Sequence, residues 1–117
     1  MSVRAIVKTL TDTDTSYNGV IILPKNSTEE HFISYMDESL RRIVFEEKEA
    51  LEVLLYSEAS GFTGTVVFTK YRDTFMFKKC SNFFKASNLK TGDKVEFYLR
   101  GIVGKSMHVE FQQIRSV

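Results

Sequence analysis

Residues 4–32, RAIVKTLTDTDTSYNGVIILPKNSTEEHF, contain the pattern that decides the fold. Arg4–Leu10 alternates between two sets of side chains with a period of two residues, which is typical of a β-strand. Thr11–Asn18 is polar and rich in turn-forming Thr, Asp, Ser and Asn. Gly19–Leu23 is a short apolar run that ends at Pro24, which has no N–H for a central ladder. This stretch predicts two strands joined by a long polar loop.

A helix is predicted directly after the second strand. Ser27 and Glu30 have the spacing of a capping box, in which each side chain satisfies a backbone N–H at the start of a helix. Positions i, i+3 and i+4 of this helix form an apolar stripe of Phe32, Tyr35 and Met36. A second short helix is expected over Ser81–Asn88, with Asn88 in the left-handed position that ends many helices.

The rest of the chain favours strands. The expected strands are Ile43–Phe45, Leu51–Tyr56, Thr65–Lys70, Thr74–Lys78, Lys94–Arg100 and a last one through Met107, Val109 and Phe111. Charged or glycine-containing turns over Glu46–Glu49 and Gly101–Ser106 separate some of them. Seven or eight short strands with two small helices predict a mainly β protein, folded as a closed or nearly closed barrel.

Length and composition indicate one domain over residues 1–117, because 117 residues hold one core of normal size. Apolar runs such as Val20–Leu23 are far shorter than the roughly 20 residues of a membrane-spanning helix. The single cysteine, Cys80, excludes an internal disulfide and fits a reducing compartment. We therefore expect an intracellular protein, monomeric as a domain, that has no membrane partner.

The net charge of +1 conceals a separation of charge along the chain. Residues 29–58 carry nine acids and three bases, a net charge of −6. Residues 59–117 carry ten bases and four acids, a net charge of +6. Such asymmetry allows a basic face on a nearly neutral protein, and a basic face favours a polyanionic partner.

The sequence lacks a convincing catalytic or cofactor site. Gly104-Lys105-Ser106 resembles the end of a phosphate-binding loop, but Leu99 occupies the position of its first glycine. His31 and His108 belong to no cluster with metal-ligand spacing. Glu46-Glu47-Lys48 has the carboxylate-x-lysine spacing of metal-dependent nucleases without their Pro-Asp partner, and it is better explained as a charged turn. We expect no enzyme activity, no cofactor and no metal.

Three segments together resemble one family, the plant "B-three" DNA-binding domain, which also serves as the recognition or effector domain of certain type II restriction endonucleases. The first segment, without a gap, is Lys8-Thr9-Leu10-Thr11, Asp14-Thr15-Ser16, Gly19, Pro24-Lys25, Glu29, His31 and Phe32. The second is Phe83, Leu89, Gly92-Asp93, Val95 and Phe97, and the third is the closing strand Val109–Phe111.

The resemblance implies a seven-stranded open β-barrel, called a DNA-binding pseudobarrel, flanked by two short helices. It also implies that two loops grip the major groove of double-stranded DNA, an N-arm at Thr11–Gly19 and a C-arm at about Lys70–Thr74. Base contacts are expected from Arg72 to guanine and from Asn18 to adenine. Further arm contacts, to bases or phosphates, are expected from Thr11, Asp14, Thr15, Ser16, Tyr17, Gly19, Tyr71, Asp73 and Thr74. Phosphate contacts are expected from Lys8, Lys25, Lys70, Lys78 and Lys79.

Departures from the plant pattern favour a microbial member of the family. Trp is absent, the C-arm is short, and Asp37–Glu52 has no counterpart in the family pattern. The preferred hypothesis is a non-catalytic, sequence-specific recognition or effector domain of a type II restriction endonuclease, with a nuclease domain in the full-length protein. The alternatives are a plant transcription factor, which would be nuclear rather than cytoplasmic, and a pseudobarrel interaction module that does not bind DNA.

Overall fold

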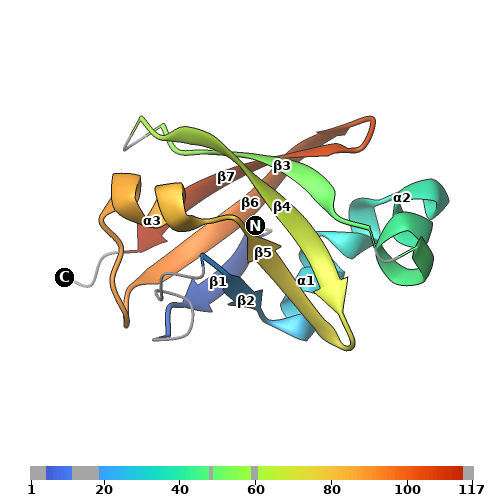
Figure 1. The fold of residues 1–117 in the computed structure, drawn as a ribbon, viewed down its shortest axis with the longest axis horizontal. Coiled ribbons are helices and arrows are strands. Elements are labelled where there is room, and N and C mark those ends of the chain that lie inside the picture. The colour runs from blue at the N-terminus through green and yellow to red at the C-terminus, as the bar shows by residue number, and fades with distance from the viewer. Residues whose placement is uncertain (1–4, 12–18, 48, 59–60, 115–117) are drawn as a thin grey trace.

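The computed structural model describes residues 5–11, 19–47, 49–58 and 61–114. They form one seven-stranded sheet in the order β1-β6-β7-β3-β4-β5-β2 (Figure 1). Its strands are β1 (Ala5–Thr9), β2 (Ile21–Leu23), β3 (Leu51–Tyr56), β4 (Thr63–Tyr71), β5 (Thr74–Lys78), β6 (Lys94–Val103) and β7 (Ser106–Ile114). Neighbouring strands are antiparallel except β3 and β7, which are parallel. The sheet curls into a nearly closed barrel, as expected from the sequence.

Short helices lie between the strands. They are α1 (Lys25–His31), a 3₁₀ turn η1 (Ile33–Tyr35), α2 (Glu38–Arg42), a π-helical segment η2 (Ile43–Glu47) and α3 (Ser81–Ser87). Among the described residues there are thus three short α-helices, where the sequence predicted two. None of the described helices has the length and hydropathy needed to cross a membrane.

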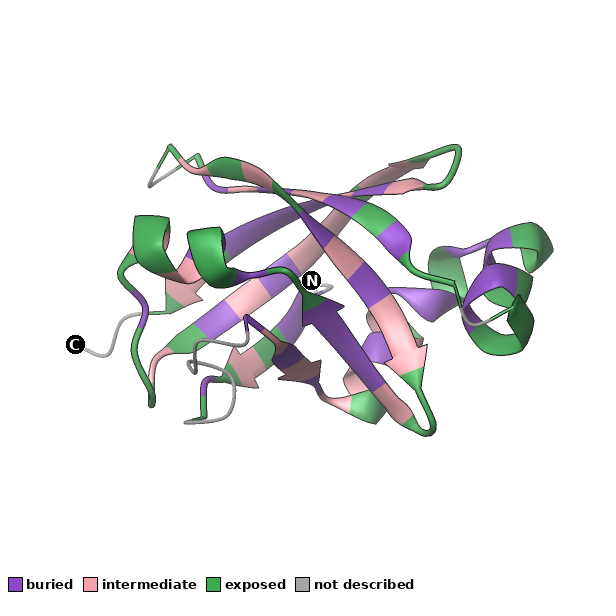
Figure 2. Ribbon diagram, viewed as in Figure 1, coloured by how far each residue is buried: buried purple, intermediate pink, exposed green. Residues whose placement is uncertain are grey.

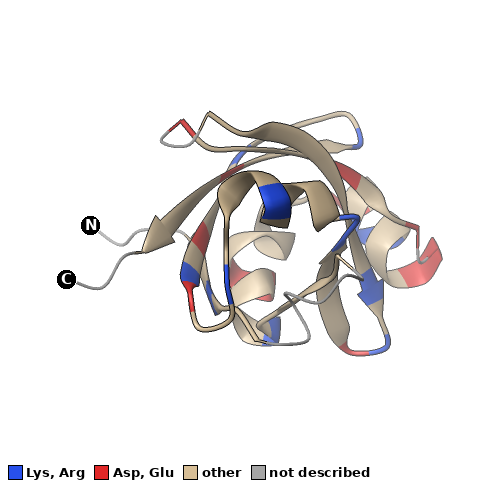
Figure 3. Cartoon of the chain, turned by 60° about the vertical axis from the view of Figure 1, so that its left-hand side comes forward, with Lys and Arg blue, Asp and Glu red and all other residues tan. Residues whose placement is uncertain are grey.

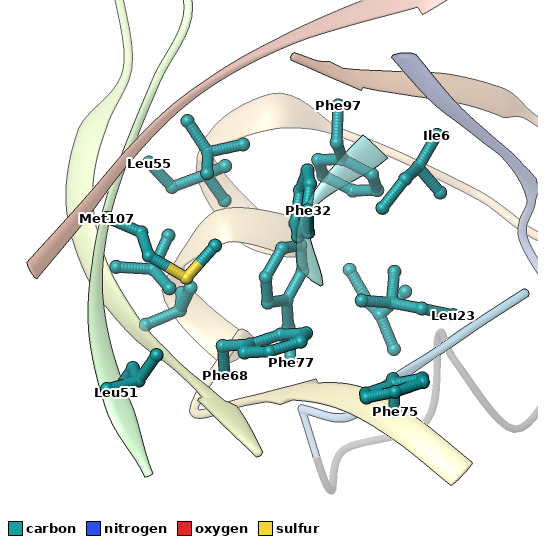
Figure 4. Packing of buried hydrophobic residues seen from close by; sticks show 14 of the residues in the cluster. Ile6, Leu23, Phe32, Leu51, Leu55, Phe68, Phe75, Phe77, Phe97 and Met107 are labelled. Atoms are coloured by element: carbon teal, nitrogen blue, oxygen red, sulfur yellow. The ribbon is translucent and has the colours of Figure 1, made fainter. Parts of the chain in front are cut away.

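Buried residues alternate along the strands of the barrel (Figure 2), and aromatic rings pack together in its interior (Figure 4). Phe77 on β5 is fully buried, and its ring lies 5.1 Å from Phe97, 6.0 Å from Phe68 and 6.1 Å from Phe32, between ring centroids. These rings come from β4, β5, β6 and the end of α1. One cluster therefore joins strands from both halves of the sheet to the first helix.

The prediction of a strand at Ile43–Phe45 is wrong, because this segment is helical. Asp37 caps α2 by accepting a hydrogen bond from the Leu40 amide at 2.9 Å. Leu40, Ile43 and Val44 are buried and follow the i, i+3, i+4 spacing of a helix. A three-residue apolar run has no periodicity of its own, so the flanking residues decide its structure. Glu46 and Glu47 likewise lie in η2 rather than in a turn.

The capping box predicted at Ser27 and Glu30 does not form. The first helix begins three residues earlier than this box implies: Pro24, not Ser27, occupies the N-cap position, without a side-chain cap, and Lys25 is the first helical residue. Pro24 still ends β2, and its carbonyl oxygen accepts a hydrogen bond from the buried Thr28 hydroxyl at 2.7 Å. Of the predicted stripe, Phe32 and Met36 are buried, whereas Tyr35 is 45% exposed.

Other element boundaries agree closely with the sequence. Leu51–Tyr56 and Thr74–Lys78 form strands with the predicted bounds, and Asn88 ends α3 in the left-handed conformation with φ 52°. The turn predicted over Gly101–Ser106 is too long. An irregularity between Leu99 and Gly101 lets β6 continue to Val103, so only two residues separate β6 from β7.

Truncation of Phe77 tests the importance of the ring cluster. We expect Phe77→Ala to lower the free energy of unfolding by about 3–5 kcal/mol, because it leaves a cavity among three rings. Val103→Ala is the control, since Val103 is 66% exposed and its loss should change stability by less than about 0.5 kcal/mol. Urea denaturation followed by circular dichroism measures both, and equal losses would contradict this account of the core.

Candidate nucleic-acid interface

The strip formed by β4, β5 and β2 connects the places where the two predicted arms begin. In this strip, Met76 of β5 pairs with Thr69 of β4 on one side and Ile22 of β2 on the other. Because side chains alternate along a strand, the burial of Phe75 and Phe77 in the core turns Thr74, Met76 and Lys78 toward the opposite face. We call this opposite face of β4, β5 and β2 the outer strip.

The predicted C-arm is the β4–β5 hairpin, whose tip projects from the barrel (Figure 1). Tyr71 pairs with Thr74, so the loop has two residues, Arg72 and Asp73, both exposed. Arg72 has φ 57°, a left-handed conformation that costs a residue other than glycine about 1–2 kcal/mol. Tyr71 is 61% exposed, and the Arg72 guanidinium lies 5.4 Å from the centroid of its ring. The tip thus offers a guanidinium, a carboxylate and an aromatic ring to a partner.

Lys70 lies at the base of the C-arm and has two contacts within the protein. Its ammonium group donates a hydrogen bond to the Arg72 carbonyl oxygen. It also lies 5.4 Å from the centroid of the Phe45 ring of η2. Lys70 pairs in register with the buried Phe75, on the inner face of the hairpin. The phosphate contact predicted for Lys70 therefore competes with two existing contacts.

Hydrogen bonds fix both ends of the predicted N-arm. At its start, the Leu10 amide donates to the Asp93 carbonyl and the Leu10 carbonyl accepts from the Gly92 amide, each at 2.8 Å. At its end, the Gly19 carbonyl accepts from the Cys80 amide at 2.8 Å. Of the predicted N-arm contacts, Thr11 is exposed, and Asp14, Thr15, Ser16, Tyr17 and Asn18 lie outside the described residues. Cys80, directly before α3, thus holds one end, and Gly92 and Asp93, in the turn between α3 and β6, hold the other.

Gly19 is buried and serves to anchor the arm. Its φ is 65°, and a Cβ atom at this position would lie 2.8 Å from the Ser81 amide nitrogen and 3.1 Å from the Cys80 amide nitrogen. Only glycine allows the backbone to approach the start of α3 this closely in this conformation. The structure therefore explains Gly19 through packing, whereas the sequence suggested a DNA contact.

Exposed basic side chains lie at both ends of the outer strip. Lys25 lies two residues after the end of β2, whose last residue, Leu23, pairs with Phe75 close to the C-arm. Lys78 and Lys79 lie at the opposite end of β5, next to the Cys80 amide that binds Gly19. The two ends are about 13–16 Å apart, given a rise of about 3.3 Å per residue along β5. Figure 3 shows a basic and an acidic residue side by side at the hairpin tip.

Lys8 does not belong to this group. It lies on β1 and shares the inner face of that strand with the buried Ile6 and Leu10. Its side chain is half-buried and has an interaction of its own. The outer strip, by contrast, contains the half-buried Thr69 and the largely buried Met76, neither of which was predicted to contact DNA. Their alternation with Phe68 and Phe77 is the signal that could have placed them there.

A second polar cluster lies on β6 and β7, away from the predicted contact residues. Arg100 forms an ion pair with the largely buried Glu110 at 2.7 Å, and this hydrogen-bonded carboxylate raises the pKa of Arg100. The Tyr98 hydroxyl donates to Glu96 at 2.7 Å, which together with partial burial raises the pKa of Tyr98 to about 12. An adjoining cavity of about 410 Å³ is lined by His31, Tyr35, Leu99, Arg100, Gly101 and Ile102. None of these residues was predicted to contact DNA.

The described residues include no group of three His, Cys, Asp or Glu side chains that could hold a metal ion. Cys80 is buried, and among the described residues it is the only free cysteine. Glu46 and Glu47 of the nuclease-like motif lie on η2, and Glu46 is 3.7 Å from Arg42.

Comparison with known proteins gives matches only among solved structures; no family model and no curated protein matches the chain. The Arabidopsis FUS3–DNA complex matches with a TM-score of 0.65 and 17% identity, over 91% of this chain and 93% of that chain. The DNA complex of the Arabidopsis thaliana transcription factor LEC2 matches with a TM-score of 0.61 and 19% identity, over 80% and 79%. The N-terminal domain of Helicobacter pylori LlaJI.R1 matches with a TM-score of 0.51 and 15% identity, over 95% and 87%.

These similarities confirm the fold that the sequence predicted. The chain has the pseudobarrel architecture of the two plant proteins and of the Helicobacter pylori domain, over 80–95% of its length. Identities of 15–19% mean that the likeness lies in the path of the backbone rather than in shared side chains.

A glycine pair tests the anchor of the N-arm. Gly19→Ala and Gly104→Ala both place a side chain at positive φ, but a Cβ atom at Gly104 meets no atom within 4 Å. We expect Gly104→Ala to cost about 1–2 kcal/mol of unfolding free energy from the backbone alone. Gly19→Ala should cost about 1–3 kcal/mol more, because the backbone of α3 must move. Denaturant titration of both variants measures the difference, and equal costs would exclude the close approach.

Proposed function

We propose that this chain is a non-catalytic domain that binds double-stranded DNA in a sequence-specific manner. The observation that carries the proposal is the placement of the residues that bound the two predicted arms. β5 begins at the C-arm hairpin and ends two residues before Cys80, whose amide binds Gly19 at the end of the predicted N-arm. Exposed basic side chains lie at both ends of β5. Two solved structures with this fold are DNA complexes, which supports the same use of the barrel here.

The dimensions of the outer strip suit the major groove. A separation of about 13–16 Å between its ends compares with a groove about 12 Å wide. Lys25 near one end and Lys78 and Lys79 at the other would then face the two phosphate backbones, which positions the barrel without reading sequence. The arms would enter the groove between them.

Sequence reading is assigned to the tips of the arms. The Arg72 guanidinium has the forked donors that pair with guanine O6 and N7, and Asn18 has the amide that pairs with adenine. Asp73 would accept from cytosine N4 or orient the neighbouring guanidinium. Hydroxyl groups of Thr11, Thr15, Ser16, Tyr17 and Thr74, together with Asp14, supply further contacts of either kind.

The same proposal extends to the biological setting. A short C-arm of two loop residues and the lack of tryptophan favour the recognition or effector domain of a type II restriction endonuclease over a plant transcription factor. The similarity of the fold to a Helicobacter pylori N-terminal domain supports a microbial member. A nuclease domain elsewhere in the full-length protein would then provide the catalysis.

The salt dependence of binding tests the phosphate contacts. If Lys25, Lys78 and Lys79 each neutralise one phosphate, log K falls with log salt concentration with a slope of about −2.7. Fluorescence anisotropy of duplexes selected from a random library, between about 50 and 200 mM salt, measures this slope. A slope shallower than about −2, or no enrichment of any sequence at low salt, would instead support an interaction module.

Arg72 provides the test of base reading. Arg72→Ala should weaken binding to the selected site by about 1–3 kcal/mol and relax selectivity at one base pair, while random DNA is affected much less. Arg72→Lys should not restore selectivity, because an ammonium group lacks the planar fork.

The matched control is Lys105→Ala, which removes an exposed charge in the β6–β7 turn, three strands from β5. It should leave selectivity unchanged. Equal losses on selected and random DNA for Arg72→Ala would show that Arg72 contributes only charge.

A further inference from the structure

The base of the C-arm contacts the α2–η2 segment. In this segment, Phe45 of η2 packs edge-on against Phe75 of β5, with ring centroids 6.0 Å apart and an interplanar angle of 84°. Phe75 is fully buried and pairs in register with Lys70. Figure 1 shows the α2–η2 segment beside the part of β4 that leads to the hairpin tip. The helical α2–η2 segment thus lies against the base of the predicted DNA-reading loop.

Lys70 connects the α2–η2 segment to the tip of the C-arm. Its ammonium group lies over the Phe45 ring, at 5.4 Å, and donates a hydrogen bond to the Arg72 carbonyl oxygen. Of the two loop residues, Arg72 is the one with a left-handed backbone conformation. The hydrogen bond from Lys70 therefore holds the carbonyl group of the loop residue whose backbone conformation is less favourable. Phe45, Lys70 and Arg72 form a continuous series of contacts from η2 to the arm.

This geometry also separates Lys70 from the lysines of the outer strip. Lys78 pairs with Val67 on the outer face and is exposed, whereas Lys70 is half-buried on the inner face beside Phe75. An ammonium group that donates to the Arg72 carbonyl oxygen and lies over the Phe45 ring is directed toward these two groups, not toward the phosphates that Lys78 would meet.

We propose that Lys70 and Phe45 are positioning residues that fix the conformation of the Arg72 loop, and that Lys70 is not a phosphate contact. The inference rests on the proposed DNA-binding function and assigns specificity to the α2–η2 segment. Phe45 orients the ammonium group, the ammonium group holds the Arg72 carbonyl, and the guanidinium is thereby presented in one orientation.

Comparison of two lysine variants on the same hairpin tests the proposal. Lys70→Met and Lys78→Met each remove one charge and retain most of the side-chain volume. Removal of a phosphate contact makes the salt slope shallower by about 0.9. We expect that change for Lys78→Met, with equal weakening on all sequences. For Lys70→Met we expect an unchanged slope and a loss of discrimination at the base pair read by Arg72, about 5- to 10-fold.

Substitution of Phe45 tests the role of the ring. Phe45→Leu should reproduce the loss of discrimination caused by Lys70→Met, whereas Phe45→Tyr keeps the aromatic face and should retain wild-type discrimination. Effects of Lys70→Met and Arg72→Ala should be non-additive, because both act on one contact with DNA. A shallower slope with unchanged discrimination for Lys70→Met, or wild-type behaviour of Phe45→Leu, would overturn the proposal.

A measurement on the free protein separates this proposal from the proposed function. In ¹H–¹⁵N NMR spectra, Lys70→Met and Phe45→Leu should shift the Arg72 and Asp73 amide signals and increase fast motion there, whereas Lys78→Met should not. Unchanged loop signals in both variants would overturn the positioning role even if DNA binds. Altered loop signals in a protein that selects no DNA sequence would support the positioning contacts and overturn the proposed function.

Discussion

The inward packing of Phe75 and Phe77 on β5 is the constraint on which the rest of the arrangement depends. Both rings are fully buried, and Phe77 contacts rings from the end of α1 and from β4 and β6. A strand that buries alternate residues must present the others on its opposite face. The core therefore sets the direction of the outer strip and fixes where the β4–β5 hairpin begins. A one-residue change of register would place Lys78 in the barrel and a phenylalanine outside it.

Strand β5 also leads to one anchor of the predicted N-arm, the long loop between β1 and β2. These two strands lie at opposite ends of the sheet order, and their connecting segment is tied down at Leu10 and Gly19 by three backbone hydrogen bonds. Two of these bonds are made by Gly92 and Asp93, in the turn that precedes β6. The third is made by Cys80, which follows Lys78 and Lys79. Helix α3 lies between these anchors in the sequence. It thus links the predicted N-arm to β5, from which the C-arm extends.

The sequence was informative wherever one periodicity dominated a segment. The alternation of Val95, Phe97 and Leu99 and the apolar run from Leu51 gave strands close to those observed, and Asn88 marked the end of α3 because few residues tolerate a left-handed conformation. It failed at Ile43–Phe45, where three apolar residues fit either period and the cap at Asp37 decided the outcome. It also placed the first helix at Ser27, although Pro24 already ends the strand and serves as the N-cap.

The positions of both arms follow from the resemblance to the DNA-binding pseudobarrel family and stay a prediction. The contacts at the base of the C-arm were beyond what the sequence could indicate. The contacts of Lys70 with Phe45 and Arg72 join residues that are 25 and two positions apart, and no local pattern indicates which face of β4 a given lysine occupies until the inward residues are known. Gly19 appeared to be a loop residue, yet its neighbours are the first residues of a helix more than 60 positions later.

The burial of Cys80 gives the molecule an internal reporter. This is the sole thiol of the chain; it is fully buried, and its own backbone amide makes the bond to Gly19. A thiol reacts with alkylating reagents only as an accessible thiolate. The rate of alkylation under native conditions therefore measures how often the start of α3 separates from the barrel. A ligand that stabilises the anchor of the N-arm at Gly19 would lower this rate. Local opening of this anchor is thus observable in the unaltered protein.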